Sequence, residues 1–398
     1  MTTSQIAFSI NASTLNNALS KVIGVINKAA ISEYLSCVKL TIKDDELSIE
    51  GTNMDCVISS YDNTVSNTTN GAICVDAYSL FDIIKRLPKD KNIDFSMESN
   101  GENLSYLNIQ SGKSKFDLAT LNPENYPETL VTIKDQRIEM ENEELLFLIE
   151  KTEKCIYQNE TRYNINGMLL NFDKDNGKIF GISTHGHALA HAFVENKGIS
   201  QSQKVTIPRK IVSELKKILA SEKGITTIDV SNAKVTFNFT NSSLTTKLIE
   251  AEFPDYNRVI PKDYTDYFSV NTKNFLNAID RVSSIYSGAT TEIGIKLNIT
   301  QDSVKIKSIK DINKGFDEVP SEFTMENEMQ IMCNFSYLKD ILSLINSPDV
   351  KIFVKDSNFP MIVRDSETDS FLYVLMPMKI WFLKIIVALR PKMCYSNI

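Results

Sequence analysis

The chain contains three similar segments at equal, domain-sized intervals. FSINASTLNNAL, IEMENEELLFLI and FSVNTKNFLNAI begin at Phe8, Ile138 and Phe268, so the two intervals are the same (138 − 8 and 268 − 138). In each copy, two apolar residues alternate as they do in a strand, and a polar break then precedes an apolar i, i+4 pair typical of a helix. The sequence therefore predicts a strand that leads into a helix three times.

A second set of segments keeps nearly the same interval. VDAYSLFDI, IPRKIVSEL and CNFSYLKDI begin at Val75, Ile207 and Cys333. Solenoid units run from about 20 to 50 residues, whereas ordinary domains run from about 100 to 150. We therefore predict three similar domains in a row. Their expected boundaries are 1–129, 130–260 and 261–380, followed by a tail at 381–398.

Between the predicted helices lie alternating runs with turn residues at their centres. They include CVKLTIKDDELSIEG at 37–51, MLLNFDKDNGKIFGIS at 168–183 and IKLNITQDSVKIKSI at 295–309. Such runs are typical of hairpins closed at DD, DN and QD turns. Each domain would then hold two helices packed on sheets, which is an α+β architecture.

Composition favours a globular chain with reduced thiols. Hydrophobic residues make up 42% and charged residues 23% of the 398 residues, and the net charge is −7. The start, MTTSQIAFSIN, lacks the features of a secretory signal, and no apolar run approaches the ~20 residues of a membrane span, so we expect a cytoplasmic protein. Six cysteines without a CxxC pair do not suggest a disulfide framework. The negative charge disfavours polyanionic partners except through local basic surfaces.

The segment RKIVSELKKILASEK at 209–223 has such a basic surface. At 3.6 residues per turn, an apolar stripe faces one way and Arg209, Lys210, Lys216 and Lys217 face the other. A solvated helix face explains one such helix. However, Lys85 and Arg86 follow the equivalent segment of the first repeat. Basic side chains without interleaved aromatics suit phosphate contacts that carry no sequence information.

Simple geometry relates three domains to a ring. A 130-residue domain has a radius of gyration of about 14 Å, which gives a centre-to-centre spacing of roughly 33 Å. A closed ring of three such domains leaves a hole of about 5 Å, and a ring of six leaves about 33 Å. Because duplex DNA is about 20 Å across, two chains could encircle it and one could not.

These repeats and several short segments resemble the bacterial sliding clamp family, the β subunit of DNA polymerase III. The segments are ETRYNINGMLL (160–170), STHGHALA (183–190), EFPDYNRVIP (252–261) and YVLMPMKI (373–380). The resemblance implies an α+β fold of three tandem DNA-clamp (processivity fold) domains, with helices lining the inside of a ring and antiparallel sheets outside. It also implies a homodimer that encircles double-stranded DNA without sequence preference.

In that family the clamp is a non-catalytic processivity factor without a cofactor. It tethers the polymerase III α subunit and also binds the clamp loader and other proteins that carry clamp-binding motifs. Raising the local concentration of the enzyme at the DNA is enough to make synthesis processive. The resemblance therefore predicts no catalytic residues and no metal.

The resemblance also assigns three sets of residues. The partner-peptide pocket would be formed by Tyr163, Ile165, Thr184, Gly186, His187, Leu189, Pro254, Arg258, Val259, Asn334, Tyr337, Val374, Met376, Pro377 and Met378. DNA contacts would come from Lys28, Lys85, Arg86, Asn159, Tyr163, Arg209, Lys210, Lys216 and Lys217. The dimer seam would join Ile83, Phe116 and Leu118 of the first domain to Ile285 and Tyr286 of the third.

The chain departs from the family at several places, among them Lys379 in place of a frequent arginine and INKAAISEYL, which lacks the family's usual basic loop and proline. Ala188 stands where the family often has a basic residue, which would weaken polar anchoring of a peptide. The family normally ends at the MPMKI segment, but this chain continues with WFLKIIVALRPKMCYSNI at 381–398. The apolar part of this extension is too short to span a bilayer. Because it leaves directly from Met376–Met378, we expect it to cover part of the peptide pocket.

Two alternative functions follow from other features. The three histidines, His185, His187 and His191, would in another context suggest a zinc or nickel site and a metal hydrolase. They lack an evident carboxylate or cysteine partner nearby, and the plainer interpretation is a polar strand end and loop. The other alternative is a repeat scaffold that binds proteins but no DNA, which would leave the basic helix faces unexplained.

Overall fold

The computed structural model describes residues 6–30, 32–99, 105–128, 130, 134–159, 161–286, 294–310, 312–325 and 327–378. The tail at 381–398 lies outside the described residues. The chain divides into two compact units. Unit 1 contains Met1–Phe147, Asp173–Gly177 and Asn196–Glu250, and unit 2 contains Leu148–Phe172, Lys178–Glu195 and Ala251–Ile398. Each unit therefore includes part of the central repeat.

Unit 1 is built on one sheet in the order β10-β15-β16-β17-β4-β3-β2-β6-β9-β8-β7-β1-β5. From the first repeat come β1 (Ala7–Asn11), β2 (Cys37–Lys43), β3 (Glu46–Thr52), β4 (Cys56–Asp62), β5 (Ser66–Thr69), β6 (Gly71–Asp76), β7 (Asn92–Ser99), β8 (Ser105–Ser111) and β9 (Ser114–Leu121). The others are β10 (Gln136–Glu141), β15 (Ile225–Val230), β16 (Lys234–Asn238) and β17 (Ser242–Lys247). The helices are α1 (Ala12–Val22), α2 (Ala77–Arg86) and α4 (Arg209–Ser221), which follows β14 (Gln203–Pro208).

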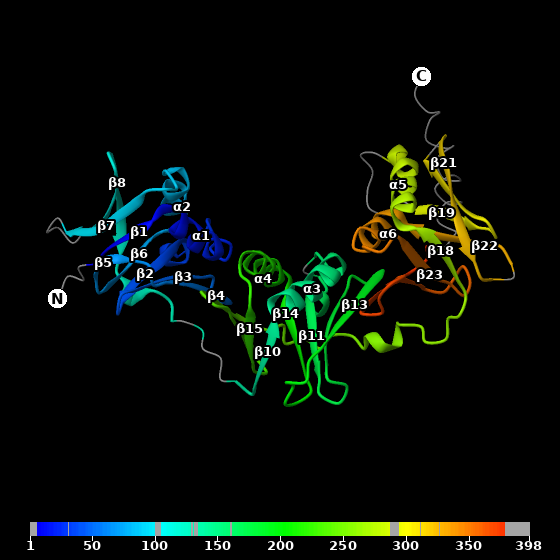
Figure 1. Ribbon diagram of the computed structural model, residues 1–398, viewed down its shortest axis with the longest axis horizontal. Coiled ribbons are helices and arrows are strands. Elements are labelled where there is room, and N and C mark those ends of the chain that lie inside the picture. The colour runs from blue at the N-terminus through cyan, green and yellow to red at the C-terminus, as the bar shows by residue number, and fades with distance from the viewer. Residues whose placement is uncertain are drawn as a thin grey trace, which may run out of the picture. The chain divides into compact units, whose positions relative to one another are not determined.

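In unit 2 the neighbouring strands run β11-β12-β13-β25-β24-β23-β18-β21-β20-β19-β22. They are β11 (Gly167–Asp173), β12 (Lys178–Thr184), β13 (Ala188–Glu195), β18 (Tyr267–Asn271), β19 (Gly294–Ile299), β20 (Ser303–Lys310), β21 (Asn313–Phe323), β22 (Met329–Asn334), β23 (Asp349–Phe353), β24 (Met361–Asp365) and β25 (Phe371–Leu375). The helices are α5 (Thr272–Ser283) and α6 (Phe335–Leu342), which pack on each other (Figure 1). Helix α3 (Asn142–Thr152) contributes to both units.

The three predicted strand-to-helix transitions are confirmed as β1–α1, β10–α3 and β18–α5. The polar break is a helix cap in the first and third cases. Asn11 accepts backbone N–H bonds from Ser13 and Thr14, and Asn271 accepts one from Asn274. Such caps satisfy amide groups that the first helical turn leaves without partners. The repeated sequence pattern therefore encodes where each of these helices begins.

The predicted hairpins are also present. The last residue pair in the ladder of strands β2 and β3 is Lys43 opposite Glu46. The two residues that connect the strands, Asp44 and Asp45, have φ values of 53° and 62°. A two-residue turn with positive φ at both positions matches the natural twist of a hairpin. Strands β19 and β20 also form an antiparallel hairpin, with the three residues 300–302 between them. The α+β class is thus confirmed.

Consecutive repeats are joined by backbone pairing between strands. In unit 1, β17 of the central repeat pairs with β4 of the first repeat, from Ser242 opposite Ser60 to Thr246 opposite Cys56. In unit 2, β13 of the central repeat pairs with β25 of the third, from Ala188 opposite Leu375 to Ala192 opposite Phe371. These two ladders make the sheets continuous across both junctions.

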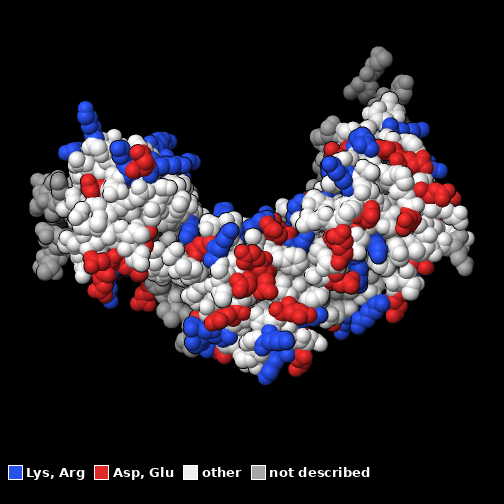
Figure 2. All heavy atoms as spheres, in the orientation of Figure 1, with Lys and Arg blue, Asp and Glu red and all other residues white. Residues whose placement is uncertain are grey.

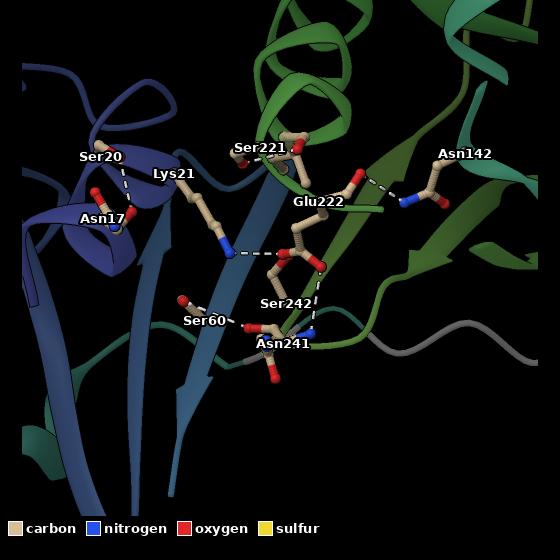
Figure 3. Close-up of polar contacts among 10 residues, drawn as sticks. Asn17, Ser20, Lys21, Ser60, Asn142, Ser221, Glu222, Asn241 and Ser242 are labelled. Carbon is tan, nitrogen blue, oxygen red and sulfur yellow. Dashed lines mark hydrogen bonds and ion pairs between the residues drawn. The ribbon is translucent and has the colours of Figure 1, made fainter. Parts of the chain in front are cut away.

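A buried ion pair reinforces the first junction (Figure 3). The Lys21 ammonium on α1 lies 2.6 Å from a carboxylate oxygen of Glu222, and both side chains are largely buried. The Ser242 hydroxyl donates to the same oxygen at 2.5 Å, and the Asn241 N–H donates to the other oxygen at 3.3 Å. The backbone carbonyl of Glu222 accepts the Asn142 side-chain amide at 3.0 Å. Glu222 therefore contacts three other segments of the chain, at Lys21, Asn142 and Asn241–Ser242.

A second buried carboxylate lies close to this junction. The Glu214 side chain on α4 covers Gly24, so a Cβ atom at position 24 would lie only 1.9 Å from a Glu214 oxygen. The Glu214 carboxylate is paired with the Lys217 ammonium at 2.8 Å. Glycine at position 24 thus leaves room for the Glu214 carboxylate just beyond the end of α1.

We predict that Glu222→Gln lowers the free energy of unfolding of unit 1 by about 3 kcal/mol, because it leaves the Lys21 ammonium buried without its counter-charge. Urea denaturation followed by circular dichroism measures this loss. Lys247→Met, which breaks the exposed Lys247–Asp55 pair, is the control and should cost less than about 1 kcal/mol. Equal small losses in both variants would contradict a structural role for Glu222.

Candidate functional site

The predicted pocket residues converge in unit 2 at the junction of β13 and β25. Leu189 lies opposite Val374 in that ladder, and the Met376 N–H donates to the His187 carbonyl at 2.9 Å. Leu189 and Val374 belong to one buried cluster with Ile165. The cluster also contains Leu169, Ile182, Phe253 and Tyr256. Three of the predicted residues therefore form an apolar floor.

Three apolar side chains of the predicted pocket are exposed, and each lies within three residues, in sequence, of a member of the buried cluster. Tyr163 is 58% exposed, Val259 41% and Met376 39%. Tyr163 begins the 3-10 turn that ends at Ile165, and Val259 directly follows the turn Tyr256–Arg258. We name these three residues, with the floor residues Ile165, Leu189 and Val374, the apolar patch. Exposed apolar side chains that form a contiguous surface are typical of interaction sites.

The loop between β12 and β13 forms another side of the site. The Thr184 hydroxyl lies 2.7 Å from the Ala188 carbonyl, and the Gly186 N–H donates to the Thr184 oxygen at 3.1 Å. Gly186 has a φ of 91°, and a Cβ atom there would lie 2.8 Å from an Arg162 guanidinium nitrogen. The positive φ favours glycine, and a Cβ atom would also require the Arg162 guanidinium to move.

Aromatic rings from this loop pack on helix α6. The Tyr337 ring lies 4.3 Å from the His185 ring and 6.0 Å from the His187 ring. Asn334 caps α6 by accepting the backbone N–H bonds of Ser336 and Tyr337. The predicted flanking residues Asn334 and Tyr337 are thus placed beside the loop by the start of one helix.

A small pocket lies behind this aromatic contact. It is lined by Lys154, Cys155, His185, Ala188, Tyr337, Asp340, Ile341 and Leu344. The Lys154 ammonium contacts the Asp340 carboxylate at 3.3 Å and the Ser343 hydroxyl at 2.8 Å. Neither Lys154 nor Asp340 belongs to a sequence motif, and their contact spans 186 residues, so no pattern in the sequence predicts this pair.

The remaining predicted pocket residues lie on the margins. Arg258 is exposed and its guanidinium pairs with Asp255 at 3.0 Å. Pro254 is exposed, and Pro377 is half-buried. The Met378 N–H donates to the Met332 carbonyl at 2.7 Å, so the described chain ends against β22.

The three histidines do not form one group. Burial, followed by the proximity of His187, lowers the pKa of His185 to about 4. The backbone N–H of His187 donates to the ring Nδ1 of His185 at 3.4 Å. His191 instead packs on Phe180 and Tyr256, and burial lowers its pKa to about 4. Within the described ranges, no group of three or more His, Cys, Asp or Glu could hold a metal ion.

The predicted basic surface on α4 has the expected arrangement. Ile211, Val212, Leu215, Ile218 and Leu219 are buried. Arg209, Lys210 and Lys217 are exposed and Lys216 is half-buried. The prediction missed that Lys217 is neutralised locally by Glu214.

Other predicted DNA contacts lie at helix ends and loops. Lys85 and Arg86 are exposed in the last turn of α2, and Arg86 also pairs with Asp82 at 3.5 Å. Figure 2 shows Lys and Arg side chains gathered where α2 lies in unit 1. The Lys28 ammonium lies 5.4 Å from the centre of the Tyr78 ring. Asn159, in unit 2, is exposed.

The predicted seam residues of the first repeat lie at an unpaired strand edge. Strand β9 pairs with β8 along its length but with β6 only at Thr120 and Leu121. Among the described strands, Ser114–Ala119 therefore have one open edge. Phe116 is 37% exposed on this edge strand, whereas Leu118 and Ile83 are half-buried.

In the third repeat, the seam prediction and the structure place the exposed residues differently. Tyr286 is buried, with its hydroxyl within 3.1 Å of the Gly294 and Ile309 carbonyls, and Ile285 is half-buried. The exposed apolar residues lie instead at the β20–β21 hairpin, where Ile312 and Phe316 are solvent-accessible and Phe316 is 59% exposed. Residues 313–320 of β21 pair only with β20 among the described strands.

No helix in the described part of the chain has the length and apolar character needed to cross a membrane.

Comparisons with known proteins extend over nearly the whole chain. Models of the N-terminal, central and C-terminal domains of the DNA polymerase III beta subunit match residues 6–131, 139–255 and 257–379. The beta sliding clamp of Caulobacter vibrioides is 28% identical over 93% of this chain and 99% of its own length. That of Pseudomonas putida is 29% identical over 94% of this chain and 100% of its own.

Solved clamp structures have the same fold. A sliding clamp from Pseudomonas aeruginosa bound to griselimycin has a TM-score of 0.88 and 28% identity, covering 94% of this chain and 99% of that one. The C. crescentus clamp crystallised with polyethylene glycol has a TM-score of 0.89 and 28% identity, covering 95% and 100%. The resemblance inferred from sequence motifs is therefore confirmed, and the chain belongs to the DNA polymerase III beta subunit family, the non-catalytic sliding clamps built from three tandem clamp domains.

Proposed function

We propose that two copies of this chain close into a ring that encircles duplex DNA and holds DNA polymerase III on it. The observation that carries this proposal is the pair of open strand edges, one on β9 in the first repeat and one on β21 in the third. A ring of identical chains joined head to tail needs two different surfaces, one from each end of the chain. These two edges supply such a pair.

Pairing β9 of one copy with β21 of the other would continue a sheet across the seam. Backbone bonds between edge strands give affinity, and alternate side chains give specificity. Each edge carries an exposed phenylalanine, Phe116 on β9 and Phe316 on β21. Each also carries both signs of charge, with Lys115 and Asp117 on one and Lys314 and Asp317 on the other. An open edge with exposed aromatic residues is otherwise a hazard for aggregation, which a seam removes.

The proposed DNA contacts are basic groups of the helices and their flanking loops. Lys28, Lys85 and Arg86 from the first repeat and Arg209 and Lys210 from the central repeat would meet phosphates. Phosphate contacts make binding depend on salt, whereas enclosure does not. A chain with net charge −7 therefore suits retention by topology, with weak contacts that permit sliding.

The apolar patch is the proposed site for peptides of the polymerase III α subunit, the clamp loader and other partners. The methionine among its exposed residues, Met376, allows one surface to adapt to several sequences. Its position between the central and third repeats agrees with domains proposed at 1–129, 130–260 and 261–380. A replication factor of this kind would act in the cytoplasm.

Retention on DNA tests the ring directly. We expect the chain, once placed on DNA by a clamp loader, to remain on nicked circular DNA through gel filtration at 0.5 M salt and to leave when the circle is cut. A groove-binding protein or a scaffold that ignores DNA would treat circular and linear DNA alike, and that result would contradict the proposal.

The seam predicts a separate outcome for Phe116→Asp. This substitution removes an apolar contact of the seam and puts a carboxylate in its place. Loss of a central interface contact costs about 2 kcal/mol, so the dimer Kd should rise at least about 30-fold. Analytical ultracentrifugation measures this change. Ile225→Asp, at another exposed apolar position of a strand, should leave the dimer Kd unchanged, and a Phe116→Asp chain that dimerises normally would exclude this seam.

The apolar patch predicts that Val259→Asp weakens binding of the polymerase III α subunit at least about 30-fold, because an ionised group would lie where an apolar side chain is expected to dock. Titration calorimetry gives the affinity. The variant should still form dimers and remain on circular DNA. Unchanged affinity for the α subunit would place the partner site elsewhere.

A further inference from the structure

The described chain ends at the border of the apolar patch. The Met376 N–H donates to His187 at 2.9 Å, and the Met378 N–H donates to the Met332 carbonyl at 2.7 Å. A Cβ atom at Gly294 would lie 3.0 Å from the Met378 sulfur. Backbone hydrogen bonds thus hold residues 376–378 in place. The segment that follows Met378 therefore starts beside Met376, a residue of the patch.

The sequence that follows is strongly apolar. Residues 381–389 read WFLKIIVAL, and 379–398 contain no Asp or Glu. Hiding such side chains from water contributes about 25 cal/mol for each Å² of apolar surface. Packing on another apolar surface would therefore stabilise a segment of this composition. The apolar surface nearest to it along the chain includes Met376, which is 39% exposed.

We propose that residues 381–389 pack on the apolar patch of their own chain and compete there with partner peptides. This inference rests on the proposed function of the patch. Among the described residues of unit 2, the exposed large apolar side chains outside the patch are Ile309, Ile312 and Phe316 at the β20–β21 hairpin and the single Phe359. The hairpin is assigned to the seam and would be covered by the second copy, so the patch is the group of exposed apolar side chains that stays open beside the start of the tail.

The short connection makes even a weak contact effective. Only two residues, Lys379 and Ile380, separate Met378 from Trp381. Short flexible connections give effective concentrations on the order of 1 mM. A tail segment that binds the patch with an intrinsic Kd of about 0.1 mM would then raise the apparent Kd of a partner about tenfold. The tail would favour partners that bind strongly or at several points.

Trp381 is the only tryptophan of the chain, so its fluorescence reports on the tail alone. In the full-length dimer we expect Trp381 to resist acrylamide quenching at least threefold better than in a synthetic peptide of residues 379–398. Val259→Asp should remove this protection, and Ile225→Asp should not. Protection that survives Val259→Asp and Tyr163→Asp, or quenching equal to that of the free peptide, would overturn the proposal.

Competition is tested with the polymerase III α subunit. A chain ending at Met378 should bind it about tenfold more tightly than the full chain, and so should the full-length triple variant Trp381→Ser/Phe382→Ser/Leu383→Ser, which keeps the tail length. Equal affinity of all three forms would overturn the inference. Protection of Trp381 that appears only as the chain concentration rises would also overturn it, because the tail would then be docking on another copy. If the α subunit binds none of the three forms, the proposed function of the patch fails, while the quenching experiment still decides where the tail lies.

Discussion

Hydrogen bonding between strands of different repeats is the constraint on which the rest of the structure depends. The β17–β4 and β13–β25 ladders convert three similar sequences into continuous sheets. Strand pairing fixes register, since a slip of one residue would turn every side chain to the other face. The position of Val374 opposite Leu189, and hence the floor of the apolar patch, follows from that register.

The two junctions use buried charge in addition to strand pairing. At the first junction, the Glu222 carboxylate accepts hydrogen bonds from Lys21, Ser242 and the backbone N–H of Asn241. At the second, the largely buried Lys151 lies against the Leu344 carbonyl beyond α6, with its ammonium 4.3 Å from the centre of the Phe371 ring. A buried ion needs such partners in fixed positions, and an apolar contact would not impose the same geometry. Charge therefore helps to define how consecutive repeats meet.

Local patterns in the sequence predicted what local physics determines. Alternating and 3.6-residue periodicities located the strands and helices, and the DD turn at Asp44 and Asp45 located a hairpin. Contacts between distant residues left no such pattern. Glu214 and Glu222 are buried although their type is usually exposed, and their partners lie on other elements. The sequence also did not predict the exposed edge at Phe316. That residue is exposed because part of β21 has a neighbouring strand on one side only, and sequence periodicity does not reveal this. The pocket residues came from family motifs rather than from periodicity.

Enclosure of DNA by two chains can be seen by negative-stain electron microscopy of the purified full-length protein. We expect closed rings with a central opening of roughly 33 Å, the width expected for six domains of this size. Compact particles without an opening, at every concentration at which the protein stays in solution, would contradict it.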